Sequence, residues 1–373
     1  MTDRKYRDAA ERLLAVAGVA INGSDPWDIE VHDDRLYARV FAEGTVGFGE
    51  AYMDGWWEAK ELDETMARIV GSRIQHQLPR NLKMVRLALQ ARWTNRQSSR
   101  RVWAVGREHY DLGNDLFEAT FDARLTGSCG YWKNAEDLDA AQDGKLDLVC
   151  RKIGLRSGQS VFDIGCGWGA FMGFAAERFG AKCAGMTISK EQVSYVAKRY
   201  AGMPVEARLM DYRDATGEYD HVVSMGMFEH VGPKNYRTYF EVAARLLGDG
   251  GFFLLHTIGA KGSGSAMDPW MDKYIFRNGV LPSLPQIGQA IDGLFVVEDV
   301  HNFGADYDKT LMAWFEKFDR NWEWLKDTYD ERFYRMWKFY LLASAGGFRC
   351  RNIQVWQIVL SKHGVPGGYT AVR

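Results

Sequence analysis

Several features that would place a protein in a broad class are missing from this sequence. Its five cysteines are odd in number and scattered, and no two form a C-x-x-C pair, which argues against a disulfide framework and a zinc site. No apolar run approaches the roughly 20 residues of a membrane-spanning helix. The N-terminus is charged and lacks the apolar stretch of a secretory signal. A net charge of −2 gives no overall field to attract nucleic acid. We therefore expect a cytoplasmic protein without a metal site or a nucleic-acid partner.

What the sequence does contain is an alternation of apolar runs and helical patterns. At 373 residues and 46% hydrophobic content, the chain is long enough for one large or two ordinary domains. Strands are predicted up to Asp163 and at 182–188, 205–210, 220–225, 251–258 and 353–360. Helices are predicted at 189–200, opened by a Ser189 cap, and at 236–247. Such alternation predicts an α/β fold with a doubly wound, mostly parallel sheet.

One glycine-rich stretch follows the first of these strands. Asp163 ends the apolar run, and Gly165, Gly167 and Gly169 follow at every second position before a helical pattern begins. The stretch has neither the G-x-G-x-x-G spacing of dinucleotide sites nor the G-K-[ST] of a phosphate loop. S-adenosylmethionine (SAM) has no pyrophosphate, and its amino group and sulfonium suit a nearby carboxylate. The pattern therefore favours a SAM-binding turn.

Polar residues stand where the predicted strands end. In parallel sheets these ends meet at one edge, where ligands bind. The residues at these ends are Asp163, Gly165, Thr187, Asp211, Tyr212, Glu229, His230, His256 and Ile258. Many methyltransferases place an acid after the second strand to hold the ribose hydroxyls. Here Thr187 and Gln192 would supply neutral hydrogen bonds instead.

The N-terminal 80 residues predict a small α/β unit. A helix is expected over 6–19, and the alternation in 28–37 predicts a strand pair that turns at Asp33 and Asp34. The stretch 47–57 is rich in glycine and aromatic residues, which indicates either ordinary packing or a lipid-contacting surface.

A basic stretch follows at 65–107, with ten Arg or Lys and no acid. A basic amphipathic helix is typical of a membrane-surface element. The alternative is a solvated interdomain helix whose bases pair with acids of a neighbouring domain, and nucleic acid is a weaker third interpretation.

Several strings in the chain closely resemble cyclopropane-fatty-acyl-phospholipid synthases. They include E-H-Y-D-L-G-N-D-L-F (108–117), D-I-G-C-G-W-G (163–169), T-I-S-K-E-Q (187–192), M-F-E-H-V-G-P-K-N-Y (227–236), L-L-H-T-I-G (254–259) and N-F-G-A-D-Y (302–307). The resemblance implies a class I SAM-dependent methyltransferase with a Rossmann-like sheet and a smaller N-terminal α/β domain. We expect an accessory lipid-binding domain at 1–80, a basic helical linker at 81–105 and a catalytic domain at 106–373.

The resemblance also implies which residues form the site. SAM would be held by Gly127, Ser128, Asp163, Gly165, Cys166, Gly167, Trp168, Gly169, Thr187, Ile188, Ser189, Gln192, Tyr212 and Arg213. The residues alone leave Cys129 open as a nucleophile, a contact or a bystander. The resemblance makes it one contact of a bound bicarbonate. The implied set around that ion is Cys129, Glu229, His256, Ile258 and Tyr307.

By resemblance, the enzyme would add a methylene from SAM across a cis double bond in a phospholipid acyl chain. Methyl transfer to an alkene leaves a carbocation, and a base, bicarbonate in this hypothesis, would remove a proton so that the ring closes. Backbone N–H groups of Cys129 and Ile258, with His256 and Tyr307, would donate to it. Glu229 would orient His256 or accept the bicarbonate hydroxyl, and a histidine that titrates near neutral pH would suit this role.

The resemblance further implies a homodimer that attaches peripherally to the inner face of an anionic membrane. Two other functions remain open. One is a SAM-dependent methyltransferase that leaves a methyl branch or a methylene on the acyl chain, or that methylates an amine. The other is a lipid-binding module that has kept the fold without catalysis.

Overall fold

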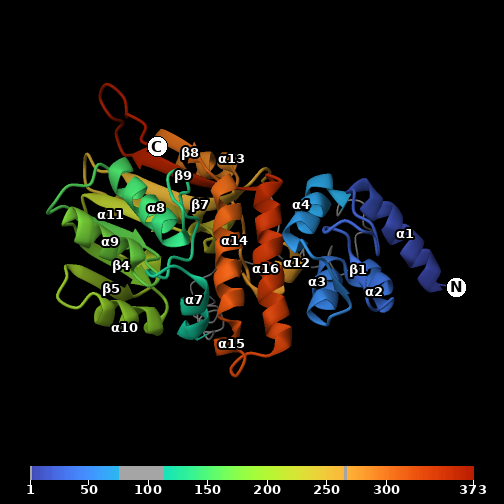
Figure 1. Ribbon diagram of the computed structural model, residues 1–373. Helices are drawn as coiled ribbons and strands as arrows, with labels where there is room; N and C mark the ends of the chain where they lie inside the picture. The colour runs from blue at the N-terminus through green and yellow to red at the C-terminus, as the bar shows by residue number, and fades with distance from the viewer. Residues whose placement is uncertain (1, 75–112, 264–266) are drawn as a thin grey trace. The chain divides into compact units, whose positions relative to one another are not determined.

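The chain folds into two compact units, which we describe separately. The computed structural model describes residues 2–74, 113–263 and 267–373 (Figure 1). The first unit contains the described residues up to 74 together with Met267–Arg277 and Tyr307–Ile353. The second contains 113–263 together with Asn278–Asp306 and Gln354–Arg373. The N-terminal residues thus share a unit with two later segments. The expected linker at 81–105 lies outside the described residues, and the predicted domain boundaries stay a prediction.

A seven-stranded sheet forms the centre of the second unit, in the order β5-β4-β3-β6-β7-β9-β8. The strands are β3 (Ser160–Ile164), β4 (Lys182–Thr187), β5 (Val205–Leu209), β6 (His221–Met225), β7 (Phe253–Ala260), β8 (Val296–Asn302) and β9 (Ile353–Ser361). The pairs β3–β4, β3–β6, β4–β5 and β6–β7 are parallel, and β8 pairs antiparallel with β9. The predicted doubly wound, mostly parallel sheet is confirmed.

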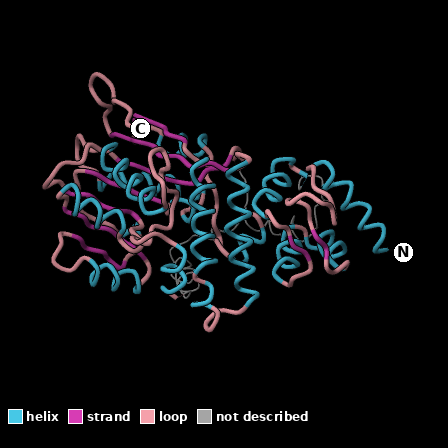
Figure 2. The backbone as a smooth tube through the Cα atoms, in the orientation of Figure 1, coloured by secondary structure: helices cyan, strands magenta, loops and turns pink. Residues whose placement is uncertain are grey.

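Helices cover both faces of this sheet (Figures 1 and 2). The elements are α7 (Asn114–Thr120), α8 (Leu138–Lys152), α9 (Ala170–Phe179), α10 (Lys190–Arg199), α11 (Tyr236–Leu246), α13 (Leu284–Ile291) and the 3-10 turns η2 (Tyr212–Asp214), η3 (Phe228–His230) and η4 (Pro233–Asn235). One buried cluster joins α8, α9 and α10 to the sheet, and the other joins α11 and α13 to its opposite face.

Residues alternate between these two clusters along each strand, as a period of two requires. Val161, Leu254 and Val359 belong to the cluster under α8–α10. Asp163, His256 and Gln357 each stand two positions from one of them. The three polar side chains therefore share the face of the sheet that α8 covers.

Most of the elements predicted for this unit are present. The six predicted strands correspond to β3–β7 and β9, and the predicted helices to α10 and α11. The side chain of Ser189 caps α10 by accepting a hydrogen bond from the N–H of Gln192 (3.2 Å), as predicted. Strand β8 was missed, because its exposed valines and interspersed acids show neither a continuous apolar run nor a clean alternation.

The first unit is mainly helical. Its elements are α1 (Thr2–Val16), β1 (Glu30–Val31), α2 (Arg35–Glu43), α3 (Thr45–Met53), β2 (Trp57–Glu58), α4 (Leu62–Ser72), α12 (Pro269–Tyr274), most of α14 (Ala305–Arg320), α15 (Trp322–Leu325) and α16 (Glu331–Arg349). Helix α1 stops short of the predicted Val19, because the chain turns at Gly18, which has a φ of 65°.

The predicted strand pair in 28–37 is wrong. Only Glu30–Val31 is a strand, and it pairs antiparallel with Trp57–Glu58, far along the chain. The second half begins α2 instead, where the N–H of Arg35 donates to the Asp33 carboxylate (2.9 Å). Leu36 and Tyr37 are buried on one side of this helix. A helix can bury both of these neighbouring apolar side chains on one side, whereas a strand would point them to opposite faces.

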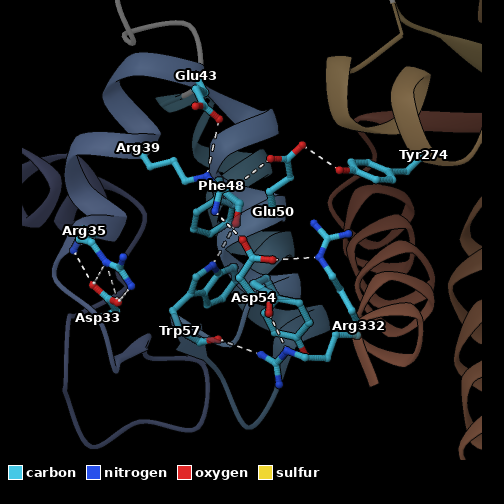
Figure 3. Close-up of polar contacts among 12 residues, drawn as sticks. Asp33, Arg35, Arg39, Glu43, Phe48, Glu50, Asp54, Trp57, Tyr274 and Arg332 are labelled. Atoms are coloured by element: carbon cyan, nitrogen blue, oxygen red, sulfur yellow. Dashed lines mark hydrogen bonds and ion pairs between the residues drawn. The ribbon is translucent and has the colours of Figure 1, made fainter. Parts of the chain in front are cut away.

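Ordinary packing explains the glycine- and aromatic-rich stretch 47–57. Most of α3 is buried, and a Cβ at Gly49 would overlap the ring of Trp270 in α12. The Glu50 carboxylate accepts from Arg39 (2.5 Å) and from the Tyr274 hydroxyl (2.8 Å) (Figure 3). It also accepts from Lys273. These hydrogen bonds hold the pKa of Glu50 down at about 2, although burial opposes them. The hydrogen bonds of Glu50 with Lys273 and Tyr274 therefore hold α12 against α3.

Part of the basic stretch 65–107 is described, up to residue 74. Arg68 donates to Glu64 (2.9 Å) and lies over the Trp27 ring at 3.8 Å. The charge of Arg68 is therefore paired with groups of its own unit. None of the helices in the described ranges combines the length and apolar character required to cross a membrane.

The close contact of α16 with α4 generates a prediction about stability. A Cβ at Gly346 would lie 2.5 Å from the carbonyl oxygen of Asp63 and 2.6 Å from the N of Ala67, and neither backbone atom can easily move. A Cβ at the adjacent Gly347 would meet only the Ile353 side chain, at 3.6 Å. We expect Gly346→Ala to destabilise the protein by about 1–3 kcal/mol, as overpacking does.

Gly347→Ala is the matched control, since both changes give α16 the same gain in helix propensity. It should be neutral or stabilising. Denaturant unfolding of both variants checks the prediction, and equal free energies of unfolding would contradict it.

Candidate active site

The turn between β3 and α9 depends on its three glycines. Gly165, Gly167 and Gly169 have φ values of 95°, 54° and 79°, a region that side chains disfavour. A Cβ on Gly165 would come within 2.7 Å of Met227, in the loop after β6. A Cβ on Gly169 would press on Val196 of α10 at 2.9 Å. The turn therefore packs closely against the segments that follow β4 and β6, whereas a Cβ at Gly167 would meet no atom within 4 Å, which leaves space for a ligand to approach.

Asp163 lies beside this turn, in the last half of β3, and is 2% exposed. Its Oδ1 atom has no hydrogen-bond partner among the described residues. Burial raises the pKa of this carboxyl to about 7, and the positive charge of Lys145 opposes the rise. A carboxylate that receives the amino group of a ligand needs an oxygen that accepts no other hydrogen bond. Among the described residues, Oδ1 of Asp163 meets this requirement.

The residues after β4 form a buried neutral network. The Thr187 hydroxyl donates to Oε1 of Gln192 (2.6 Å) and accepts from the N–H of Ser189 (3.2 Å). Ile188, between them, is half-buried. Thr187 and Gln192 thus contact each other at the position where many methyltransferases have an acid.

The remaining residues predicted for SAM surround the same edge of the sheet. Tyr212 is buried, and Arg213 donates to the Asp211 carboxylate that caps η2 (2.7 Å). Cys166 is buried, which raises the pKa of its thiol well above the usual value. The Trp168 ring packs on Phe117 of α7, with centroids 4.7 Å apart.

The segment before α8 carries Gly127, Ser128 and Cys129. Ser128 is held twice: its hydroxyl accepts from Nζ of Lys145 (3.0 Å), and its carbonyl accepts from Nε2 of Gln142 (2.8 Å). Cys129 is fully buried, and its thiol donates to the carbonyl of Gly130 (3.2 Å). A Cβ on Gly226, after β6, would come within 4.0 Å of Ser128. The segment therefore reaches the strand ends.

Glu229 and Ile258 are in direct contact. The N–H of Ile258 donates to Oε1 of Glu229 (2.6 Å), while Oε2 is buried without a partner among the described residues. Burial raises the pKa of Glu229 to about 7, although the Ile258 hydrogen bond opposes it. In this structure the Ile258 N–H thus holds Glu229, whereas the hypothesis from the sequence had assigned that donor to an ion.

His256 contacts Gln357 of β9, with Nδ1 3.4 Å from Nε2 of the amide. Burial lowers the pKa of His256 well below its usual value, and the charge of Lys145 lowers it further. The expectation that this histidine titrates near neutral pH is therefore wrong, because imidazolium is disfavoured so far from water. The residue that orients His256 is Gln357, while Glu229 bonds to Ile258.

Tyr307 belongs to the first unit, whereas the other four residues predicted around the ion belong to the second. Within its unit, Tyr307 is buried and packs on Phe348, with ring centroids 4.5 Å apart, and on Trp314 at 5.9 Å.

Known proteins match both the sequence and this arrangement. The model of the mycolic acid cyclopropane synthetase family matches residues 97–358. This chain belongs to that family.

Among its relatives, the cyclopropane-fatty-acyl-phospholipid synthase of Escherichia coli K12 is 50% identical over 371 residues, which span 100% of this chain and 97% of that protein. The tuberculostearic acid methyltransferase UfaA1 of Mycobacterium tuberculosis is 35% identical over 95% of this chain and 88% of its own length. The solved mycolic acid cyclopropane synthase CmaA1, complexed with SAH and CTAB, is 32% identical, with a TM-score of 0.66 over 70% of this chain and 98% of that one. Membership confirms the predicted class I methyltransferase fold and SAM dependence.

Sequence reasoning missed three buried polar residues that contact the predicted site residues Ser128 and His256: Gln142, Lys145 and Gln357. Two of them had a signal. Gln357 is the one polar residue in the apolar run 355–360 of β9. Lys145 follows Ala141 by four residues and precedes Val149 by four, so it falls on an otherwise apolar helical stripe. Within residues 2–74, 113–263 and 267–373, no three His, Cys, Asp or Glu side chains gather closely enough to hold a metal ion.

The buried carboxyl of Glu229 predicts a pH-dependent stability. Its pKa is raised from 4.5 to about 7, so between these values the folded state holds a proton that the unfolded state has lost. Stability therefore falls as pH rises through this window, by about 3 kcal/mol for a shift of this size. We expect Glu229→Gln to be more stable than wild type at pH 8, and to differ little at pH 4.5.

Chemical unfolding of the SAM-free protein at both pH values measures this difference. Glu241→Gln is the control, because Glu241 on α11 has a side chain that is 51% exposed, and it should show almost no effect. A gain for Glu229→Gln that is equal at both pH values would contradict the prediction.

Proposed function

We propose that this enzyme transfers a methylene from SAM to the cis double bond of an unsaturated acyl chain in a phospholipid, forming a cyclopropane ring. The observation that carries the proposal is the 50% identity to the E. coli cyclopropane-fatty-acyl-phospholipid synthase across the whole chain. The site supports it, since buried polar groups from three segments converge at the carboxyl ends of β3, β6 and β7.

The residues of the second unit also fit a bound bicarbonate. Oε2 of Glu229 and Oε1 of Gln357 are buried acceptors without a partner among the described residues, and Lys145 supplies positive charge nearby. A buried acceptor without a donor is costly, which favours a ligand that brings one. Bicarbonate carries both a hydroxyl donor and a negative charge. We infer that Cys129, Glu229 and His256 would hold it, while the assignment of Tyr307 to the same ion rests on the resemblance.

Each of these side chains has a role that its surroundings support. Because an amide nitrogen can only donate, the contact with Gln357 makes Nδ1 of His256 an acceptor and leaves the proton on Nε2. His256 would then act as a fixed neutral donor. Glu229, fixed by Ile258, would accept a hydrogen bond through its other oxygen. When bound, SAM supplies the methyl group and bicarbonate accepts the proton that this group must lose.

We further propose that the lipid is reached at an anionic membrane surface on the cytoplasmic side and that the enzyme is a homodimer. The basic stretch 65–107 supports the first point by composition, because each base near an anionic bilayer contributes about 1 kcal/mol. Most of that stretch lies outside the described residues. The resemblance to bacterial phospholipid enzymes supports both points.

The product defines the reaction. Purified protein incubated with SAM and anionic vesicles of cis-unsaturated phospholipid should yield acyl chains with the high-field proton NMR signals of ring methylenes. Removal of bicarbonate from the buffer should lower the rate, and its return should restore it. A methyl branch without ring signals would instead favour the chemistry named in the M. tuberculosis relative, and no one-carbon gain would refute the proposal.

Glu229 and His256 should affect chemistry more than cofactor binding. Loss of a positioned proton-transfer or donor group lowers turnover by roughly 100-fold or more. We expect Glu229→Gln and His256→Ala to lower kcat by that factor and to change the Kd for SAM by less than about threefold. Steady-state rates and calorimetric titration with SAM give the two quantities.

His221→Ala is the matched control. His221 is also buried, and burial lowers its pKa to about 4, but it begins β6 at the opposite end of the strand from the site. Its loss should leave kcat within a few-fold of wild type. Equal losses of turnover and SAM affinity in the Glu229 and His256 variants would overturn their assignment.

A further inference from the structure

Helix α8 presents polar side chains on its buried face. Gln142, Lys145 and Lys152 are each at most 1% exposed, on a helix whose other buried residues include Leu146 and Val149. A fully buried lysine is rare unless it has partners, because the ammonium loses its hydration. The partners of Lys145 therefore indicate what it does.

The first partner is the segment that precedes Cys129. Nζ of Lys145 donates to Oγ of Ser128 (3.0 Å). One helical turn earlier, Nε2 of Gln142 donates to the carbonyl of Ser128 (2.8 Å) and more weakly to that of Thr126 (3.4 Å). Helix α8 thus holds both the backbone and the side chain of Ser128, one of the residues predicted to contact SAM.

The other partners are acids. Asp122 and Asp163 both attract the Lys145 ammonium, and Cys129 also lies within its electrostatic reach. Asp122 is already stabilised by the N–H groups of Thr126 (2.7 Å) and Arg124 (3.0 Å). By contrast, Oδ1 of Asp163 has no hydrogen-bond partner among the described residues. Of the two acids, Asp163 depends more on the lysine.

Lys145 is the positive charge that acts on Asp163, because the other ionisable groups near this carboxyl are neutral. Cys166, Cys183 and Tyr239 are also within electrostatic reach, and burial raises the pKa of each, so all three stay neutral. Burial raises the pKa of Asp163 to about 7 and lowers that of Lys145 to about 8. Near neutral pH, the charge of Lys145 therefore favours the ionised form of Asp163, while Asp122 and Asp163 together favour the charged form of Lys145.

We propose that Lys145 is a positioning residue for SAM: its buried ammonium keeps Asp163 ionised to receive the amino group of SAM, and it fixes Ser128 beside the same ligand. This inference rests on the SAM site proposed above. Without Lys145, Asp163 is protonated at neutral pH and cannot pair with a cation. Each unit by which the pKa of Asp163 rises above the working pH lowers the ionised fraction about tenfold.

The test compares Lys145→Met with Lys152→Met. Lys152 is the matched control, because it lies on the same helix with its side chain fully buried, but its partners are His301 (3.1 Å) and Asp299 (3.6 Å). The Kd for SAM is measured by calorimetry from pH 6.5 to 9, and each variant is divided by wild type, which cancels the titration of SAM itself. Thermal unfolding of the SAM-free proteins reports their stability.

We expect Lys145→Met to bind SAM at least about tenfold more weakly than wild type at pH 7, and the ratio to approach one at pH 9, where Asp163 ionises without help. Lys152→Met should bind SAM as wild type does throughout. An unchanged affinity in Lys145→Met, or a loss that is independent of pH and shared by Lys152→Met, would overturn the inference. Wild-type protein that fails to bind SAM would refute the proposed site itself, which is a separate outcome.

A second pair of variants keeps the test decisive if Lys145→Met does not fold. Asp163→Asn removes the charge that needs compensation, and loss of both members of a buried pair is tolerated better than loss of one. Adding Lys145→Met to Asp163→Asn should then cause no further pH-dependent loss of SAM affinity. A further loss of tenfold or more that changes with pH between 6.5 and 9 would show that the pH-dependent effect of Lys145 does not act through Asp163, and it would overturn the inference.

Discussion

Charge buried at the carboxyl ends of the sheet is the constraint on which this site depends. Asp163 and Glu229 each carry an oxygen without a partner among the described residues, and burial raises the pKa of both to about 7. Such groups lower the stability of the folded protein, because a buried ion without full hydrogen bonding is costly. Rigid elements support both groups: the Ile258 N–H within β7 donates to Glu229, and the positive charge of the Lys145 ammonium on α8 attracts Asp163. Hydrogen bonds from a ligand would satisfy the carboxylate oxygens that have no partner among the described residues.

Much of the second unit could be predicted because its strands are buried on both faces. Such strands are continuous apolar runs, and a polar residue marks where each one ends, as Asp163 and Thr187 do. The Ser189 cap fixed the start of α10 in the same local way. Strand β8 lacks this signature: Val296, Val297 and Val300 are exposed at the edge of the sheet. In the first unit, a two-residue strand at Glu30–Val31 pairs with Trp57–Glu58, a distant partner that local alternation does not reveal.

The site could be predicted only as far as topology and resemblance reach. Parallel strands bring their carboxyl ends to one edge, so Glu229 and Ile258 were expected near each other, and they are hydrogen-bonded. To assign a residue to one face of the sheet, one must know the register of all the strands. That register places Asp163, His256 and Gln357 on the face that α8 covers, and this placement is what led us to propose Lys145 as a positioning residue. A lysine on an apolar stripe is visible in the sequence, but its partners are not.

The state of His256 follows from the same arrangement. A histidine close to a buried carboxylate could gain a proton, since the opposite charge favours imidazolium. Here the hydrogen bond from Ile258 occupies one oxygen of Glu229, and the ammonium of Lys145 disfavours a second positive charge. Burial acts in the same direction, and Gln357 donates to Nδ1. Burial and the charges of Lys145 and Lys152 thus keep the imidazole neutral, with its proton on Nε2. In the arrangement that we propose, Lys145 also keeps Asp163 on β3 ionised.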